Sequence, residues 1–173
     1  MTQAVLGIAG WKNSGKTIIT TLLVTELTSR GLTVSTVKHA HHDADVDHEG
    51  TDSFRHRAAG AKEVALVTGR RWALMHELGQ EPEPELAFIL TRLAPVDLVI
   101  VEGFKREAIP KIEVRRLESA SDAPLSDDPN VIALAADYQV ESGRLPFFHL
   151  DDFAELANFV IDRFALLPRI VEQ

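Results

Sequence analysis

The residues best suited to chemistry lie near the amino terminus, in the stretch GWKNSGKT. It matches the pattern G-x-x-x-x-G-K-[S/T] with Gly10, Gly15, Lys16 and Thr17. The glycines let backbone N–H groups turn toward phosphate oxygens, the lysine reaches the β- and γ-phosphates, and the hydroxyl binds Mg²⁺. We therefore expect a P-loop (residues 10–17) that binds a nucleoside triphosphate, with Lys16 as a catalytic residue. The nucleotide-binding residues predicted in this stretch are Gly10, Trp11, Lys12, Asn13, Ser14, Gly15, Lys16, Thr17 and Ile18.

A second chemical group is an acidic residue at the end of another apolar run. In VDLVIVEGF, Glu102 follows the apolar residues LVIV and precedes Gly103. Ligands of open α/β sheets gather at the carboxyl ends of strands, and P-loop proteins commonly hold magnesium with an acidic residue there. Glu102 is therefore predicted to be catalytic and to bind Mg²⁺ together with Thr17. Asp97 opens the same run and is expected to lie too far from the phosphates.

The densest cluster of metal-binding side-chain types lies in KHAHHDADVDHEG. Four of the seven histidines fall within ten residues, namely His39, His41, His42 and His48. Imidazole and carboxylate together can bind Zn²⁺, Ni²⁺ or Mg²⁺, but the thiolates and helical His-x-x-x-His pair of tight sites are missing. Alternatively, Lys38 and His39 face phosphate oxygens while Asp43 or Asp45 reaches magnesium through water. A solvated acidic loop is the third interpretation, and the sequence leaves all three open.

The composition limits the class of protein. The chain has 173 residues, of which 45% are hydrophobic and 25% charged, so we expect one globular domain over residues 1–173. The net charge of −8 argues against a nucleic-acid partner, because phosphate contacts need clustered Lys and Arg. There is no cysteine, no secretory signal pattern, and no apolar run of the ~20 residues that span a bilayer. We expect a cytoplasmic protein without a membrane partner.

Apolar patterns predict the elements that position these residues. Short apolar runs predict strands over residues 4–10, 32–39, 63–69, 71–78, 97–104, 111–118 and 130–137. Helical spacing of apolar residues predicts helices over residues 17–31, 52–60, 83–95 and 151–168. The two strands on either side of Gly69 and Arg70 are expected to form a hairpin. The alternation of strands and helices predicts an α/β, three-layer P-loop NTPase fold, with a mostly parallel sheet, some antiparallel strands and helices on both faces.

Local signals predict how some of these elements begin and pack. Asp52 is expected to be the N-cap of the second helix, and Asp152 with Glu155 fits a capping box before the last helix. The strand at 111–118 alternates enough to lie at a sheet edge, and residues 118–129 are expected to form an exposed loop. The apolar face of residues 71–78 is expected to pack in the core or to form a dimer or partner surface.

Four stretches together resemble the molybdopterin-guanine dinucleotide biosynthesis protein B family, namely GWKNSGKT, KHAHHDADVDHEGTDSFRHRAAGA, RRWALM and VEGFKREAIPKIEV. The resemblance runs from the P-loop to about residue 114, and VIALAAD with the final helix extends it. It implies a homodimeric protein that binds GTP and Mg²⁺, has weak GTPase activity at most, and assists the guanylyltransferase that joins GMP to molybdopterin. That guanylyltransferase is the implied partner, beside molybdopterin and the enzymes that use the molybdenum cofactor.

The resemblance also assigns roles to residues. It implies that the loop from His39 to Asp47 and Glu102 lie near magnesium or the reacting end of the nucleotide, and that Gly103 and Lys105 contact phosphate or the partner. The sequence has no Asn-Lys-x-Asp guanine motif. Asp137, after the apolar run VIALAA, is therefore a candidate acceptor for guanine N1–H and N2–H, although it could simply begin a turn. The basic candidates for a molybdopterin surface are Lys105, Arg106 and Lys111.

Two other functions stay open. A nickel metallochaperone GTPase would bind metal through the loop histidines, although the chain lacks the cysteines that such proteins commonly present. A small-molecule kinase would need an arginine-rich lid, and residues 118–129 contain no arginine. We expect slow turnover, because no catalytic glutamine or arginine finger can be singled out, and a surface role is favoured for Arg70, Arg71 and Arg106.

Overall fold

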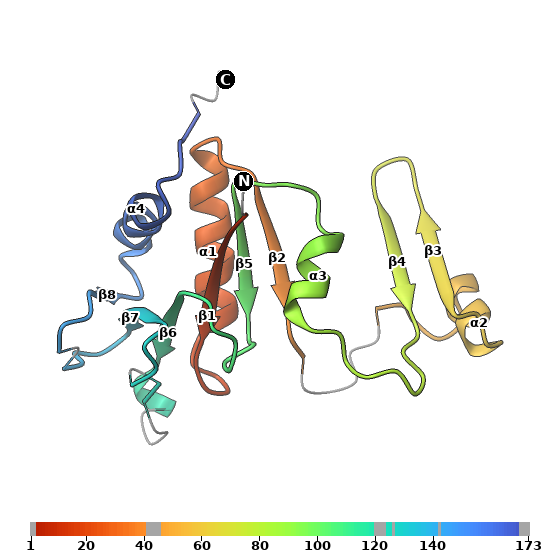
Figure 1. The fold of residues 1–173 in the computed structure, drawn as a ribbon, viewed down its shortest axis with the longest axis horizontal. Helices are drawn as coiled ribbons and strands as arrows, with labels where there is room; N and C mark the ends of the chain where they lie inside the picture. Colours follow the sequence, from red (N-terminus) through yellow and green to blue (C-terminus); the bar gives the residue numbers. More distant parts are fainter. Residues whose placement is uncertain (1–2, 41–45, 120–123, 126, 142, 170–173) are drawn as a thin grey trace. The chain divides into compact units, whose positions relative to one another are not determined.

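The chain divides into two compact units in the computed structural model, which describes residues 3–40, 46–119, 124–125, 127–141 and 143–169. The larger unit combines Met1–His39 with Thr91–Gln173, and the smaller unit is Ala40–Leu90 (Figure 1). The described strands form two separate hydrogen-bonded sheets, one of six strands and one of two. The single domain expected over residues 1–173 stays a prediction.

The larger unit is built on six parallel strands in the order β2-β5-β1-β6-β7-β8. Their bounds are β1 Ala4–Ala9, β2 Val34–Lys38, β5 Leu98–Glu102, β6 Lys111–Arg115, β7 Val131–Ala136 and β8 Phe147–His149. The predicted mostly parallel α/β sheet is therefore confirmed, and β8 is a short strand that the sequence analysis missed. Because parallel strands end at the same edge, the segments that follow β1, β2, β5, β6 and β7 all begin at one edge of this sheet.

The prediction that residues 111–118 form an edge strand is wrong. β6 ends at Arg115 and lies between β1 and β7, inside the sheet. Its polar residues are buried and paired: Lys111 is 2% exposed and bonds Asp128, while Glu113 is 1% exposed and bonds Arg115. Alternation of polar and apolar residues is typical of a strand with one face in water. In β6 the polar residues are instead buried, and each forms an ion pair inside the protein.

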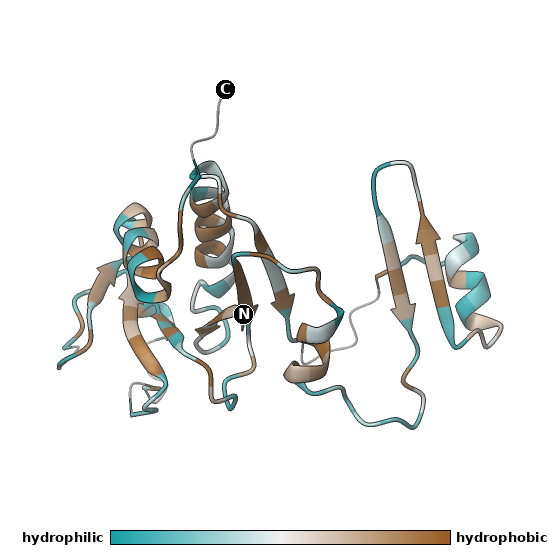
Figure 2. Cartoon of the chain, turned by 45° about the horizontal axis from the view of Figure 1, so that its top comes forward, coloured by the Kyte–Doolittle hydropathy of each residue, from teal (hydrophilic) through white to brown (hydrophobic). Residues whose placement is uncertain are grey.

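Two helices of the larger unit pack against each other, α1 (Lys16–Ser29) and α4 (Phe153–Phe164). Leu23 and Leu27 of α1 and Val160 of α4 are fully buried in one apolar cluster with residues of the strands, which are largely apolar (Figure 2). Burying a leucine side chain in this way contributes about 2 kcal/mol. The capping box predicted before α4 is wrong, because the N-cap residue Asp152 makes no side-chain capping hydrogen bond.

The smaller unit contains α2 (Asp52–Ala58) and the antiparallel pair β3 (Glu63–Val67) and β4 (Trp72–His76), which confirms the predicted hairpin. Thr68 N donates to Arg71 O across its turn at 2.9 Å. The N-cap of α2 is Thr51, whose hydroxyl accepts from Phe54 N at 3.3 Å, so the assignment of this cap to Asp52 is wrong. The helix α3 (Leu86–Arg92) follows and is shorter than the predicted range of 83–95.

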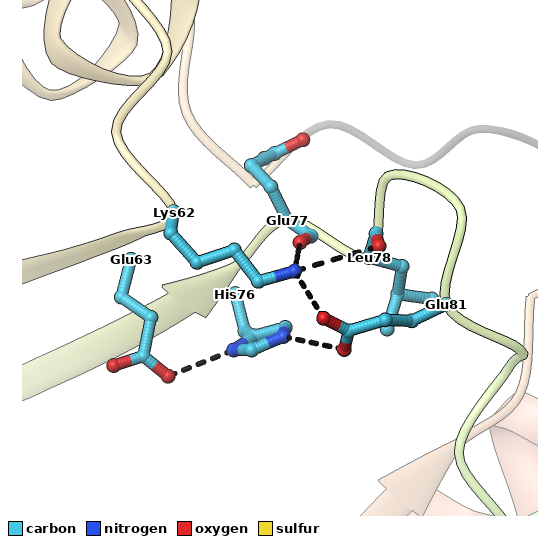
Figure 3. A network of polar contacts seen from close by, with 6 residues as sticks. All are labelled: Lys62, Glu63, His76, Glu77, Leu78 and Glu81. Carbon is cyan, nitrogen blue, oxygen red and sulfur yellow. Dashed lines mark hydrogen bonds and ion pairs between the residues drawn. The ribbon is translucent and has the colours of Figure 1, made fainter.

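A polar network joins the start of β3 to the loop after β4 (Figure 3). His76 Nδ1 lies 2.7 Å from Glu63 Oε1, and its Nε2 lies 3.3 Å from Glu81 Oε2. Lys62 Nζ donates to Glu81 Oε1 at 2.6 Å and to the carbonyl of Glu77 at 2.6 Å. The hydrogen bond with Glu63, and then that with Glu81, raises the pKa of His76. The network is thus strongest when the imidazole is protonated.

Candidate functional site

The P-loop joins β1 to α1 at the carboxyl edge of the large sheet. Gly15 is the N-cap residue of α1 and has φ +92°, a left-handed conformation that favours glycine. A Cβ on Gly15 would lie 2.9 Å from Nε of Arg116. Conformation and close approach therefore both require glycine at this position, where the helix N-terminus and its unpaired N–H groups can receive an anion.

Lys16 lies among three other charged side chains. Its Nζ donates to the carbonyl of Trp11 at 2.6 Å, within the P-loop. Burial lowers the pKa of Lys16, the positive charges of Lys105 and Lys38 lower it further, and Glu102 acts in the opposite direction. The two neighbouring ammonium groups are close enough to lower the pKa of Lys16, and an oligophosphate would stabilise such a gathering of positive charge.

Thr17 and Glu102 meet between α1 and β5, as the sequence predicted. The Thr17 hydroxyl donates to Glu102 Oε1 at 2.8 Å, and Lys38 Nζ lies 3.5 Å from the same oxygen. Glu102 is 8% exposed. A hydroxyl and a carboxylate are hard oxygen donors, and Mg²⁺ is commonly held by one or two protein oxygens together with phosphates and water. The pair therefore fits Mg²⁺.

The segments after β2 and β5 also contact each other. His39 N donates to Glu102 O at 2.9 Å, and the ring centroids of His39 and Phe104 lie 4.7 Å apart. Gly103 has φ +96°, and a Cβ there would lie 2.9 Å from the Cβ of His39. The structure thus brings His39, Gly103 and Glu102 together, and His39 belongs to a packed contact at the site.

Lys105 connects the segment after β5 to the P-loop. Its Nζ lies 3.9 Å from the centroid of the Trp11 ring, within the range of a cation–π interaction. Lys111 fixes the backbone of this segment by hydrogen bonds. Its Nζ donates to Lys105 O at 2.7 Å, to Glu107 O at 2.8 Å and to Asp128 Oδ2 at 2.8 Å. Lys111 is buried, so its assignment to a molybdopterin surface is wrong.

The remaining predicted nucleotide-binding residues make none of the contacts between Lys16, Thr17 and Glu102 described above. Lys12, Asn13 and Ile18 are exposed, whereas Ser14 is buried. Asp137 is exposed at the end of β7, where its Oδ1 accepts from Leu117 N at 2.8 Å. This contact joins the segments that follow β6 and β7 and tests neither interpretation, so guanine recognition by Asp137 stays a prediction.

The histidine–aspartate loop falls partly outside the described residues, which include neither Asp43 nor Asp45, and neither His41 nor His42. Asp47 is described: its Oδ1 accepts from Arg57 Nη2 at 2.7 Å in the smaller unit. Within the described ranges, no group of three His, Cys, Asp or Glu residues could hold a metal ion. In the same ranges no helix has both the length and the apolar character needed to cross a bilayer.

Sequence reasoning missed one part of this region, a small cavity beside the P-loop with a volume of about 100 Å³. It is lined by Trp11, Ser14, Glu113, Val114, Arg115, Ser119, Pro124 and Tyr138. Glu113 accepts from Arg115 through both carboxylate oxygens and from Leu125 N at 2.7 Å. The signal was available in KIEVRR, where charged residues approach the end of a strand, but they were assigned to a solvated edge.

Comparison with known proteins identifies the family. Residues 5–137 match the family described as molybdopterin guanine dinucleotide synthesis protein B, MobB. The chain belongs to the MobB family. It is 38% identical over 161 residues to the molybdopterin-guanine dinucleotide biosynthesis adapter protein of Escherichia coli K12, covering 91% of each chain. It is 39% identical over 158 residues to the adapter protein of Haemophilus influenzae, covering 90% of this chain and 86% of that one.

Solved structures of MobB proteins share the fold. Bacillus subtilis MobB aligns with a TM-score of 0.75 at 25% identity, over 96% of this chain and 99% of that chain. The MobB homologue of Bacillus stearothermophilus aligns with a TM-score of 0.71 at 28% identity, over 93% and 97% of the two chains. The family resemblance read from the sequence and the P-loop NTPase-like fold class of this MobB-family chain are therefore confirmed.

Proposed function

We propose that this MobB-family chain is a GTP-binding accessory protein that assists the guanylyltransferase attaching GMP to molybdopterin in molybdenum cofactor biosynthesis. The adapter role is supported by the names of its relatives at 38% and 39% identity. The nucleotide-binding part is supported above all by the 2.8 Å contact between Thr17 of the P-loop and Glu102 of β5.

In the proposed complex, backbone N–H groups of the P-loop and the N-terminus of α1 bind the triphosphate. Lys16 exchanges the carbonyl of Trp11 for phosphate oxygens, because both are acceptors within its reach. Lys38 and Lys105 add positive charge near Lys16, as their lowering of its pKa indicates.

Thr17 and Glu102 would hold Mg²⁺ in this complex. When bound there, Mg²⁺ neutralises charge on the phosphates. Glu102 contacts the Thr17 hydroxyl and the ammonium of Lys38 through Oε1, at 2.8 and 3.5 Å, so its other carboxylate oxygen would face Mg²⁺ without loss of these contacts. Asp137 would accept from guanine N1–H and N2–H with its two carboxylate oxygens, because Oδ1 keeps a second lone pair while it accepts from Leu117 N.

We further propose that the protein acts as a homodimer and turns over GTP slowly. Slow hydrolysis suits an accessory protein, whose product is an activated partner. A second copy would cover the apolar side chains that β3 and β4 expose, among which Val67 is 72%, Trp72 70% and Leu74 52% accessible. Cross-strand pairing places these three side chains on one face of the hairpin.

Reconstitution with the guanylyltransferase tests the proposal. Formation of molybdopterin guanine dinucleotide at limiting GTP is measured with the transferase alone, with the wild-type chain added, and with Lys16→Ala added. We expect stimulation by wild type and none by the variant. Equal stimulation by a folded Lys16→Ala protein would refute the role of bound GTP, and the absence of any stimulation by wild type would refute the accessory function.

A further inference from the structure

Arg116 reaches the P-loop from the strand beside it. It follows β6, which runs parallel to β1 in the register Gly7↔Lys111 to Ala9↔Glu113. Arg116 therefore lies at the same sheet edge as the start of the P-loop. Its Nε lies 2.9 Å, and its Cζ and Nη2 3.6 Å, from the position that a Cβ on Gly15 would occupy. The guanidinium thus lies beside Gly15, the N-cap residue of α1.

The buried part of this guanidinium lacks an acceptor. Arg116 Nε is buried and has no hydrogen-bond partner among the residues that the structure describes. The preceding residue behaves differently, since Arg115 Nε and Nη2 donate to Glu113 at 2.9 and 2.8 Å. The nearby carboxylate of Asp137 accepts from Leu117 N. A buried N–H without an acceptor is costly, so its retention points to an acceptor that arrives with a ligand.

A second buried polar atom without a hydrogen-bond partner belongs to Ser14, the residue before Gly15. Ser14 is 1% exposed, and its Oγ has no hydrogen-bond partner in the described part of the chain. Two buried polar atoms at the P-loop thus lack a hydrogen-bond partner among the described residues, Ser14 Oγ and, beside Gly15, Arg116 Nε. Guanidinium groups bind phosphate oxygens strongly, because they carry a permanent charge and several N–H donors in one plane.

We propose that Arg116 is a further phosphate-binding residue of the nucleotide site, supplied by the same chain from the end of β6. Its guanidinium donates to a phosphate oxygen of the bound nucleotide, which gives the buried donor an acceptor. The inference rests on the proposed function, because it needs a nucleotide in the P-loop. It also explains the close approach at Gly15, where a side chain would displace the guanidinium.

Calorimetric titration of the whole chain with GTP and with inorganic pyrophosphate, each with Mg²⁺, tests the proposal. Arg116→Gln removes the charge, and Arg163→Gln on α4 is the control with the same change of charge. Losing one charge-assisted hydrogen bond lowers affinity by about tenfold to a hundredfold, and we expect this for both probes with Arg116→Gln. The control is expected to retain wild-type affinity.

The salt dependence separates a phosphate contact from mere bracing of Gly15. Removing a cation that contacts the ligand lowers the steepness with which affinity falls as salt rises. Weaker binding by Arg116→Gln with an unchanged salt dependence would therefore refute the phosphate contact. Arg116→Met keeps an aliphatic side chain beside Gly15 without the charge. The same titrations are made with this variant if Arg116→Gln does not fold.

The outcomes for wild type and variant distinguish the two proposals. Tight GTP binding by wild type, with affinities of Arg116→Gln within twofold for both probes, would overturn the role of Arg116 and leave the proposed function intact. If the folded wild-type chain bound neither GTP nor pyrophosphate, the nucleotide function and the role of Arg116 would both be overturned.

Discussion

Replacement of Lys111 by methionine should destabilise the fold through a single lost ammonium group. Lys111 Nζ donates to Asp128 and to the carbonyls of Lys105 and Glu107. The hydrogen bond from Lys111, ahead of those from Asn130, lowers the pKa of Asp128 from 3.8 to about 2. That depression corresponds to about 2.5 kcal/mol in all. Allowing for the share of Asn130 and for two carbonyls left without their donor, we expect a loss of about 2 to 4 kcal/mol.

The sign of the pH dependence follows from the same carboxylate. The pKa of Asp128 is lower in the folded chain, so its stabilisation is present above pH 4 and is lost as the pH falls toward 2. The gap between wild type and Lys111→Met should therefore narrow between pH 7 and pH 3, by about 1 kcal/mol if the whole shift came from Lys111 and by less in proportion to the share of Asn130.

Urea unfolding of both proteins at the two pH values measures this gap, with Lys12→Met, a change at an exposed lysine, as the matched control. Stability of Lys111→Met within about 0.5 kcal/mol of wild type at pH 7, where exposed substitutions usually fall, would refute the reasoning. A large gap that does not change with pH would refute the part assigned to Asp128.

Three further predictions concern the site and the dimer. Glu102→Gln should slow Mg²⁺-dependent GTP hydrolysis by about tenfold or more while weakening GTP binding less, and equal hydrolysis rates would remove Glu102 from the site. Gly103→Ala should lower thermal stability more than Gly50→Ala: both glycines have φ +96°, but only the first approaches another residue, at 2.9 Å from the Cβ of His39. Equal effects would mean that the contact is unimportant. Trp72→Ser should raise the dimer dissociation constant in sedimentation equilibrium, and an unchanged constant would exclude Trp72 from the interface.

The parts that the sequence predicted well depend on local patterns. The P-loop motif needs only a strand, a glycine turn and a helix in succession, and these occur at β1, Gly15 and α1. Glu102 was found because it ends a fully apolar strand, and its contact with Thr17 follows from the parallel pairing of β1 with β5. Topology of this kind leaves few places for such residues.

The parts that the sequence did not predict depend on partners far along the chain. Lys111 and Glu113 look like solvated positions until the packing provides Asp128 and Arg115 as partners. The same interior placement of β6 brings Arg116 to the P-loop, which no local pattern indicates.

The N-cap of α2 was predicted wrongly, and the strand β8 was missed, for a different reason. Thr51 and Asp52 are both good N-cap residues, and backbone conformation selects Thr51. β8 spans only Phe147–His149, too few residues for a periodic pattern. The role of the loop histidines also stays a prediction, because most of that loop lies outside the described residues.

Calorimetric titration of the metal-free chain with GTP and with ATP, in the presence of Mg²⁺, tests the central claim most directly. The proposed function predicts that GTP binds more tightly than ATP, that Lys16→Ala loses this binding, and that Ni²⁺ and Zn²⁺ bind weakly to the same preparation. Tight binding of Ni²⁺ or Zn²⁺ that disappears when His41 and His42 are replaced, together with no preference for GTP, would contradict it.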